Sequence, residues 1–438
     1  MHSMDSSGLA SIIENCETVR RTGKVEQFYG AVLECIGPDA FLGEVCEVFA
    51  PHDMTSVMAE VVGFRHGRVL LMPLGPVSGI HVGSEVIASG MPASVSVSES
   101  LLGKVVDAFG QPLDGSDIEP GKLMPLYRSP INPLDRVPAN EKLHTGINAI
   151  DGFCSLAKGQ RIGIFAGSGV GKSTLLGNIA RRCEADVNII ALIGERGREV
   201  IEFIEDNLGT EGLKKSIVVV ATADEPALVR LHAAFVATVI AEYFSDCGKD
   251  VMLYMDSITR LATAQREIGL AVGEPPTSRG YTPSTFSLLP QLTERAGKFK
   301  VGGAITALYT VLVEGDDFNE PVSDTVRSIL DGHIVLTRQL ANQGVFPSID
   351  ILESLSRLYK RINDPEHQKI VQSIIKYESL FRESKELIEL GAYTEGSDVE
   401  IDRAIKVHRS LMNFISEDVK VASNRTPALK QALRSVLG

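Results

Sequence analysis

The sequence has no long apolar run and no export signal. No run in the 438-residue chain approaches the ~18 uninterrupted apolar residues that a membrane-spanning helix requires. The first residues, MHSMDSSGLASIIENCETVRR, lack a basic region followed by an apolar core. With 44% hydrophobic and 23% charged residues, the composition is that of a globular protein. We therefore expect a cytoplasmic protein that is not integral to a membrane.

Positive charge is in deficit. The chain has 43 Lys and Arg against 56 Asp and Glu, a net charge of −13. Such a surface does not attract nucleic acid or an anionic membrane over its whole area, although a local basic patch remains possible. We expect no nucleic-acid partner.

Cysteine is sparse and scattered. The chain has no C-x-x-C pair and no neighbouring histidine pair, which argues against a zinc site and against a disulfide framework. Buried, reduced thiols are expected at the six positions, which are Cys16, Cys35, Cys46, Cys154, Cys183 and Cys247.

The residue pattern of the first part of the chain changes at about residue 24. Residues 1–23 carry apolar side chains at helical spacing and predict an amphipathic helix, which either packs on its own domain or docks a partner. Residues 24–95 contain short β-rich runs between Gly, Pro, Asp and His-Gly turns. This pattern predicts a small antiparallel barrel or sandwich.

The rest of the chain predicts an α/β domain followed by helices. Within residues 96–362, a Pro- and Gly-rich connector (110–138) precedes strand-like apolar runs that alternate with helical segments. Such alternation with short connections predicts right-handed crossovers and a mostly parallel sheet. Residues 363–438 lack β-rich runs and predict a terminal bundle of helices.

A glycine-rich turn joins one of these strands to a helix. The stretch AGSGVGKST lies between IGIF and LLGNIA, and it ends in the Gly-Lys-Ser of a phosphate-binding P-loop, with Ala166 where that pattern usually has its first glycine. Glycines with positive φ turn backbone amides towards an anion at a helix N-terminus, Lys172 can reach the phosphates, and Ser173 can ligate Mg²⁺. We expect positive φ at Gly167, Gly169 and Gly171. The alternative is a turn that binds nothing. The predicted nucleotide contacts are Gly167, Ser168, Gly169, Val170, Gly171, Lys172, Ser173 and Thr174.

Two carboxylates follow strand-like runs. Asp256 ends VMLYMD and is a candidate Mg²⁺ ligand, although it can also cap the next helix. Glu195, in IGERGREV, is a candidate general base, because carboxyl ends of parallel strands converge on the phosphate site. An ion pair with Arg196 or Arg198 is an equal alternative for Glu195.

Several blocks resemble one family. The element around Glu195 and the stretch PSIDILESLS are similar to the rotary ATPase α/β superfamily, and GEPPTSRGYTPSTFSLLPQLTERAG resembles the ATPases of flagellar and virulence type III protein export. The resemblance extends from GEVCEV through TGINAIDG to LGAYTEGSD, and it implies a RecA-like P-loop core that uses ATP and Mg²⁺. FAGSGVGKS looks closer to the flagellar branch, although RGYTPS departs from the usual proline after Tyr281.

The resemblance implies residue roles that the chemistry alone left open. Glu195 matches the catalytic carboxylate, and Arg260 matches an arginine that contacts the γ-phosphate. Phe346 matches the aromatic ring on which adenine stacks, with core packing as the alternative. Arg357 matches the arginine finger supplied by a neighbouring subunit, with a solvated helix face as the alternative.

The resemblance also implies a motor and its partners. The family forms rings of six subunits that use ATP to release and unfold export substrates from their chaperones at a membrane-embedded gate. The N-terminal helix is expected to dock a stator-like regulator, and the helical C-terminal region is expected to face a central coiled-coil stalk and cargo. The protein would then associate peripherally with the inner-membrane export apparatus. Since one chain carries Lys172, Glu195 and Arg357, identical subunits arranged head to tail would complete every site.

Two other functions compete with this one. A noncatalytic, nucleotide-holding subunit of a rotary ATPase would lack the carboxylate at Glu195. A ring helicase or transcription terminator would need stacking aromatics among basic residues in its N-terminal domain. The aromatics there have few basic neighbours in sequence, which ranks this function third; they are Tyr29, Phe41, Phe49 and Phe64.

Overall fold

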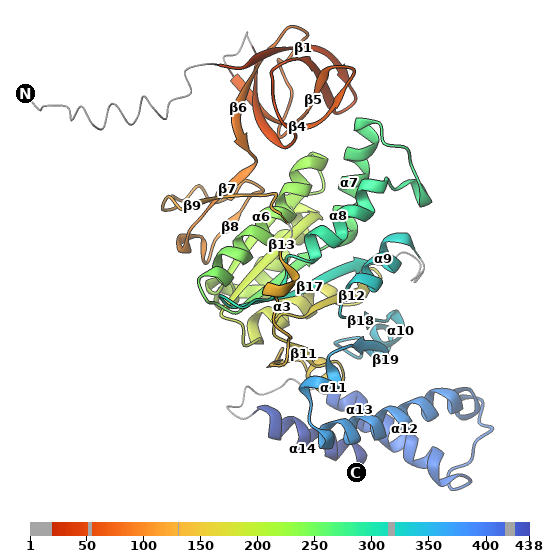
Figure 1. Ribbon diagram of the computed structural model, residues 1–438. Helices are drawn as coiled ribbons and strands as arrows, with labels where there is room; N and C mark the ends of the chain where they lie inside the picture. Colours follow the sequence, from red (N-terminus) through yellow and green to blue (C-terminus); the bar gives the residue numbers. More distant parts are fainter. Residues whose placement is uncertain (1–19, 51–54, 130, 314–319, 417–424) are drawn as a thin grey trace, which may run out of the picture. The chain divides into compact units, whose positions relative to one another are not determined.

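The computed structural model describes residues 20–50, 55–129, 131–313, 320–416 and 425–438 (Figure 1). Most of the predicted N-terminal helix, including Cys16, therefore lies outside the described residues. The chain divides into two compact units, one formed by residues up to 94 together with 268–274 and the other by 95–267 with 275–438. We describe each unit separately.

The first unit is a closed barrel. Six strands of its described residues pair antiparallel in the order β1-β2-β5-β4-β3-β6. They are β1 (Thr22–Tyr29), β2 (Val32–Ile36), β3 (Glu44–Ala50), β4 (Thr55–Arg65), β5 (Arg68–Pro73) and β6 (Glu85–Pro92). Side chains of β3 alternate between buried and half-buried, as a barrel wall requires. Closure leaves no unpaired strand edge. The barrel, rather than the sandwich, is thus the observed form.

The second unit contains a nine-stranded sheet in its described residues, with the order β19-β18-β12-β17-β15-β13-β14-β8 and β16 paired to β17. All pairs are parallel except those of β16 and β19, which confirms the predicted mostly parallel sheet. The strands are β8 (Val105–Val106), β12 (Arg161–Ala166), β13 (Val187–Glu195), β14 (Ser216–Thr222), β15 (Val251–Asp256), β16 (Gly297–Lys298), β17 (Ala304–Leu312), β18 (Gly332–Leu336) and β19 (Ile349–Ser356).

Short ribbons and helices complete this α/β core. The small strands are β7 (Ser94–Val97), β9 (Lys122–Pro125), β10 (Lys142–Leu143) and β11 (Leu156–Ala157). The helices are α2 (Asn148–Phe153), α3 (Lys172–Arg182), α4 (Gly197–Glu202), α5 (Gly209–Lys214), α6 (Ala227–Asp246), α7 (Ile258–Val272), α8 (Pro283–Thr293), α9 (Pro321–Ile329), α10 (Arg338–Asn342) and α11 (Tyr359–Ile362), with a π-helical turn η3 (Phe203–Leu208) and short 3-10 turns η1 (Glu99–Leu101), η2 (Pro133–Asp135) and η4 (Ser278–Gly280).

Helix α6 is the one helix of the described residues that is long and apolar enough to cross a membrane. However, 89% of its most apolar window is buried, and the helix packs on β13, β14 and β15. Its composition is therefore accounted for by its place in the core of the domain.

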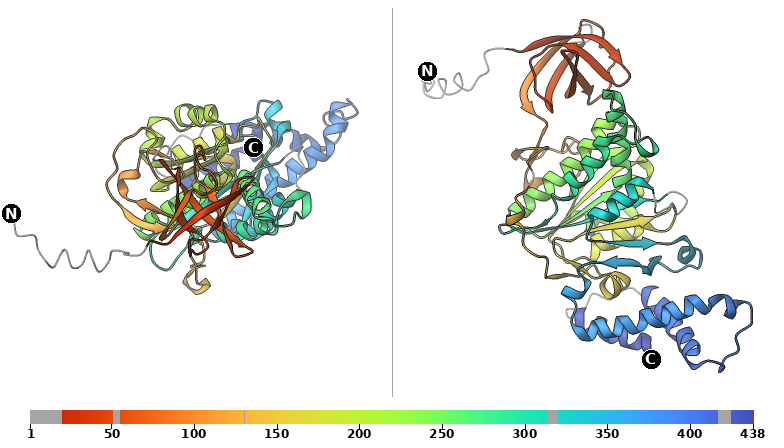
Figure 2. Two further views of the ribbon diagram at one scale, coloured as in Figure 1. Left: turned by 90° about the horizontal axis from the view of Figure 1, so that it is seen from above. Right: turned by 45° about the vertical axis from the view of Figure 1, so that its right-hand side comes forward.

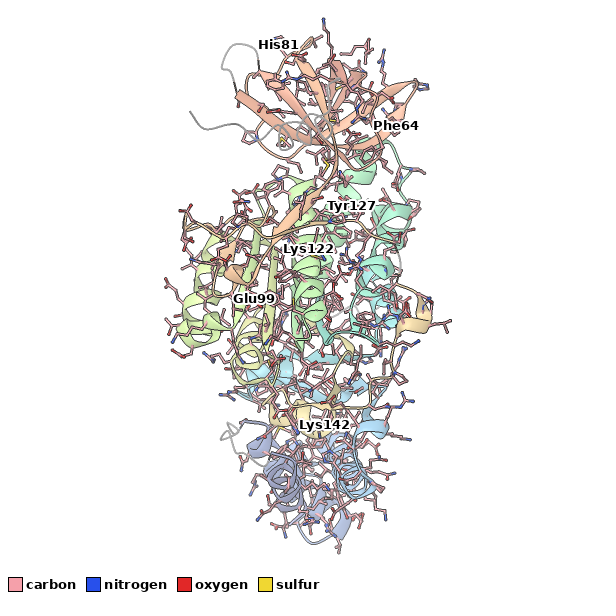
Figure 3. The ribbon with its side chains drawn as sticks, turned by 60° about the vertical axis from the view of Figure 1, so that its left-hand side comes forward. Phe64, His81, Glu99, Lys122, Tyr127 and Lys142 are labelled. Carbon is pink, nitrogen blue, oxygen red and sulfur yellow. The ribbon has the colours of Figure 1, made fainter. Side chains whose placement is uncertain are left out.

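The C-terminal helices share a hydrophobic core with this domain. α12 (Pro365–Glu389), α13 (Val399–Ser416) and α14 (Arg425–Leu437) lie side by side (blue in Figures 1 and 2). The Phe153 ring meets that of Phe414 edge to face, with centroids 6.1 Å apart. At the same junction, Lys142 Nζ donates to Asn363 Oδ1 (2.8 Å) and to the Asp151 carbonyl (3.2 Å) (Figure 3). The predicted terminal helices are thus packed onto the α/β core.

The cysteines largely match expectation. Cys35, Cys46, Cys154 and Cys183 are buried and unpaired, and burial raises the pKa of the Cys35 and Cys46 thiols to about 12. The prediction of a buried thiol was wrong for Cys247, which is exposed because it directly follows the end of α6 at the surface.

Candidate active site

The glycine-rich turn connects β12 to α3, as predicted. Gly169 (φ 76°) and Gly171 (φ 87°) adopt the left-handed conformation, and Gly171 caps α3. The expectation of positive φ was wrong for Gly167, which is buried directly after β12 and is not among the residues with positive φ. Ala166 ends β12 in extended conformation, so it needs no glycine. Backbone amides at this turn and the helix N-terminus together suit an anion.

Phe346 packs directly on this turn. A Cβ atom built on Gly171 would lie 3.3 Å from Phe346 Cδ1. Next to the ring, the Ser348 hydroxyl donates to the Val170 carbonyl (2.7 Å), which holds the segment before β19 along the turn. Phe346 is 49% exposed, so core packing does not explain it.

A pocket of about 440 Å³ opens beside Phe346. Its lining comes from four places in the chain: residues 146–148 at the start of α2, Gly171 with the length of α3, Phe346 with Pro347, and the C-terminal end of α13. Gly171, Thr174 and Phe346 are among the predicted nucleotide contacts, whereas the other lining residues were missed because nothing local marks them. The lining includes Gly146, Ile147, Asn148, Gly171, Thr174, Leu175, Asn178, Arg182, Phe346, Pro347, Ile415 and Ser416.

Lys172 lies between the two predicted carboxylates. Its Nζ is 2.5 Å from Asp256 Oδ1 and 3.7 Å from Glu195 Oε1. The Asp256 side chain is 3% exposed, and its Oδ1 also accepts from Thr310 Oγ1 on β17 (2.7 Å). Thr310 was missed, because only the strand order brings β17 beside β15. The carboxylate of Asp256 therefore points at Lys172, while Ser257 Oγ accepts the amide of Arg260 in the first turn of α7.

This cluster shifts the charges of its members. Burial, the charge of Asp256 and a hydrogen bond with Glu199 together raise the pKa of Glu195 to about 7, against the opposing effect of Lys172. Burial disfavours the charged form of Lys172, but Asp256 and Glu195 outweigh it, so the Lys172 pKa is raised. A carboxylate with a pKa near neutrality is suited to general base catalysis.

The alternative partners of Glu195 are engaged elsewhere. Arg196 Nη1 lies 3.7 Å from Glu199 Oε1, and Arg198 Nε lies 3.3 Å from Glu202 Oε1. These exposed pairs run along α4, so an ion pair between Glu195 and either arginine does not form.

Arg260 lies near this cluster, at the same end of the parallel strands as the P-loop. A Cβ atom on Gly194 would lie 3.1 Å from Arg260 Cβ, and the charge of Arg260 lowers the pKa of Lys172, which places it near the cluster. Ser168, Ser173 and Thr174 are exposed, and Val170 is buried under the turn.

Arg357 is the predicted site residue that the structure does not bring to the cluster. β19 runs antiparallel to β18, with Ile349 opposite Leu336 and Ser356 opposite Gly332. Since Leu336 lies beside Ala166 in register, Arg357 sits at the opposite edge of the sheet from its own P-loop. It lies in an exposed turn between β19 and α11 rather than on a helix face.

The turn, the lysine and the two carboxylates define a P-loop nucleotide-binding site on a parallel α/β sheet. The family models agree. The one described as ATP synthase alpha/beta family, nucleotide-binding domain, matches residues 146–356, and its beta-barrel domain matches 25–90. The model described as T3SS EscN ATPase C-terminal domain matches 363–433.

Individual relatives are similar along almost the whole chain. The flagellum-specific ATP synthase of Bacillus subtilis is 52% identical over 94% of this chain and 95% of its own. The type 3 secretion system ATPase of Xanthomonas euvesicatoria is 45% identical, over 91% and 90%. The assembled ATPase EscN of enteropathogenic E. coli, in complex with its central stalk EscO, superposes with a TM-score of 0.86 at 42% identity, covering 95% of this chain and 100% of EscN. The chain belongs to the family of flagellum-specific ATP synthases and type 3 secretion system ATPases, and it is an ATPase. The higher identity of the flagellar relative favours the flagellar branch.

Gly171 and Gly169 allow a matched test of the turn. We expect Gly171→Ala to weaken ATP binding by about tenfold or more, because the new Cβ adds a contact with Phe346 to the cost of a left-handed alanine. Gly169→Ala pays the conformational cost alone, since no atom lies within 4 Å of its Cβ. Titration with a fluorescent ATP analogue measures both, with thermal melting as the folding control. Equal losses in the two variants would contradict the contact between Phe346 and the turn.

Proposed function

We propose that this protein is the ATP-driven ring motor of a flagellar type III export apparatus, which uses hydrolysis to release export substrates from chaperones and unfold them. The position of Arg357 carries the proposal. In one chain the cluster of Lys172, Glu195 and Asp256 has no Arg357 beside it, and Arg357 stands exposed at the far edge of the sheet. A second copy of the chain is needed to bring the two together.

The residues of the cluster suit a nucleotide bound with Mg²⁺. Within the described residues no group of three His, Cys, Asp or Glu side chains forms a metal cage of its own. Mg²⁺ in NTPases is held instead by one or two protein oxygens together with phosphates. Asp256 and Ser173 would hold the ion here, and it would supply neutralisation of phosphate charge.

The chain's own groups then divide the work. The amides of residues 167–174 bind phosphate oxygens, and Lys172 shifts from the carboxylates towards the phosphates. Glu195 accepts the proton of the attacking water, and Arg260 contacts the γ-phosphate. The Phe346 ring stacks on adenine in the pocket next to the turn. Arg357 of the neighbouring subunit stabilises the charge of the transferring phosphoryl group, a role that contributes about 10³–10⁵ in rate.

A head-to-tail ring satisfies this geometry. The acceptor half of each site and the arginine lie at opposite edges of one sheet, so every interface is heterologous, and a closing rotation gives a ring of identical subunits. EscN is found assembled and in complex with a central stalk. By analogy we propose a homohexamer around a coiled-coil stalk that meets the C-terminal helices.

The remaining partners extend the same analogy. We propose that the N-terminal segment docks a stator-like regulator, and that chaperone–substrate complexes and the export gate are the other partners. The ring would work in the cytoplasm, peripherally attached to the inner-membrane apparatus. The presence of the Glu195 carboxyl group beside Lys172 argues against a noncatalytic nucleotide-holding subunit.

The pKa of Glu195 predicts a pH dependence. A protonated Glu195 cannot accept a proton, so kcat/KM for ATP should fall as the pH drops through about 7. Glu199→Gln removes a hydrogen bond that raises this pKa, so the acidic limb should move to lower pH. Initial rates between pH 5.5 and 8.5 measure the shift. Glu195→Gln should abolish most of kcat and leave ATP affinity nearly unchanged; an unmoved limb in Glu199→Gln would assign it to another group.

Mixed rings test the role of Arg357. Neither Lys172→Ala nor Arg357→Ala chains should hydrolyse ATP at an appreciable rate alone. In a one-to-one mixture, about one quarter of the sites pair an intact P-loop with an intact arginine, so up to about a quarter of the wild-type rate should return. Phosphate release is measured after mixed assembly has been verified by native mass spectrometry. Mixed rings without recovered turnover would refute the trans role.

A further inference from the structure

Three charged residues form a row across neighbouring strands at the edge of the sheet opposite the P-loop. Arg161 begins β12, Asp331 directly precedes β18, and Arg357 directly follows β19. The Asp331 amide donates to the Arg161 carbonyl (2.9 Å), and the Arg357 amide donates to the Asp331 carbonyl (3.0 Å). The row therefore places one carboxylate between two arginines, and residues opposite each other in a sheet have side chains on the same face.

Both oxygens of the Asp331 carboxylate accept hydrogen bonds from Arg161. Asp331 Oδ2 accepts from the Arg161 backbone amide (3.0 Å) and from Nε (3.1 Å), while Oδ1 accepts from Nη2 (3.2 Å). The Arg161 side chain is only 14% exposed, and it also pairs with Glu294. A paired two-point contact of this kind is among the strongest that a guanidinium makes.

Arg357 is left without such a contact. It is exposed, and among the residues that the structure describes its side chain has no ion-pair partner, although Asp331 is its neighbour in the row. The exposed Arg357 guanidinium is therefore available to an anion of another subunit.

We propose that Arg161 is a positioning residue for ATP hydrolysis: by holding Asp331, it prevents that carboxylate from capturing Arg357, which stays available to the nucleotide of the neighbouring subunit. This inference rests on the proposed role of Arg357 as a trans-acting group. An arginine bound to a carboxylate of its own chain must break that pair before it reaches a phosphate. The rate then falls by the fraction of subunits in which it is captured.

A set of substitutions at the row tests the proposal. Arg161→Gln frees the charge of Asp331 and should lower kcat about threefold to sixfold, the range that one partly exposed ion pair can impose. Asp331→Asn alone should stay within about twofold of wild type, because no charge remains to capture Arg357. The double variant Arg161→Gln/Asp331→Asn should recover most of the lost kcat. ATP affinity should be unchanged throughout, since the P-loop lies at the other edge of the sheet.

A double variant no faster than Arg161→Gln overturns the proposal, because it would mean that Arg161 acts only on the fold. Should Arg161→Gln fail to fold, Arg161→Lys gives the same comparison, with a smaller loss that Asp331→Asn again reverses. Ring assembly of each variant is verified by sedimentation.

Failure of the proposed function has a different signature. If Arg357→Ala by itself leaves kcat unchanged, the trans role is wrong and no member of the row should affect hydrolysis. If Arg357→Ala abolishes turnover while Arg161→Gln has no effect, the trans role stands and only the positioning role of Arg161 is refuted.

Discussion

The ammonium group of Lys172 offsets the repulsion between the two carboxylates of the site, Asp256 and Glu195. Two carboxylates buried so close to each other would repel, and the protein keeps them together by placing one positive charge 2.5 Å from Asp256 and 3.7 Å from Glu195. Burial and the remaining repulsion from Asp256 exceed the effect of this positive charge, so the pKa of Glu195 is raised to about 7. Phosphates bound to the same ammonium group would weaken its interaction with Glu195, so nucleotide binding and the charge state of Glu195 are linked.

The direction of β19 decides how one chain divides its functional groups. It is the outermost strand of the sheet and runs antiparallel to β18. It therefore begins beside the P-loop and ends at the opposite end of the parallel strands. Phe346 and Ser348, which contact the turn, precede the first residue of β19, and Arg357 follows its last residue. One strand therefore lies between the nucleotide pocket of a subunit and the arginine that we assign to the next site.

Much of this arrangement could be predicted because it is local in sequence. The P-loop turn and the mostly parallel sheet follow from glycine spacing and from alternating apolar runs, and these features are observed; the same reading left barrel or sandwich open for the first unit, which is a closed barrel. Glu195 and Asp256 end strands that run in the same direction, so their convergence follows from the handedness of the crossovers. The expectation for Gly167 was wrong, because the P-loop pattern suggested a positive φ that the buried residue after β12 does not require.

By itself, the sequence determined the elements, their order and the residues able to bind phosphate, since these depend on spacing along the chain and on side-chain chemistry. Only the tertiary structure decided which groups from distant segments share a site. Thr310, Ile415 and Ser416 reach it from other elements, and the carboxylate of Asp331 pairs with the Arg161 side chain rather than with that of Arg357. These contacts depend on strand order and packing. A contact between distant segments stabilises the protein only after the fold has brought both segments together, so spacing along the chain does not reveal it.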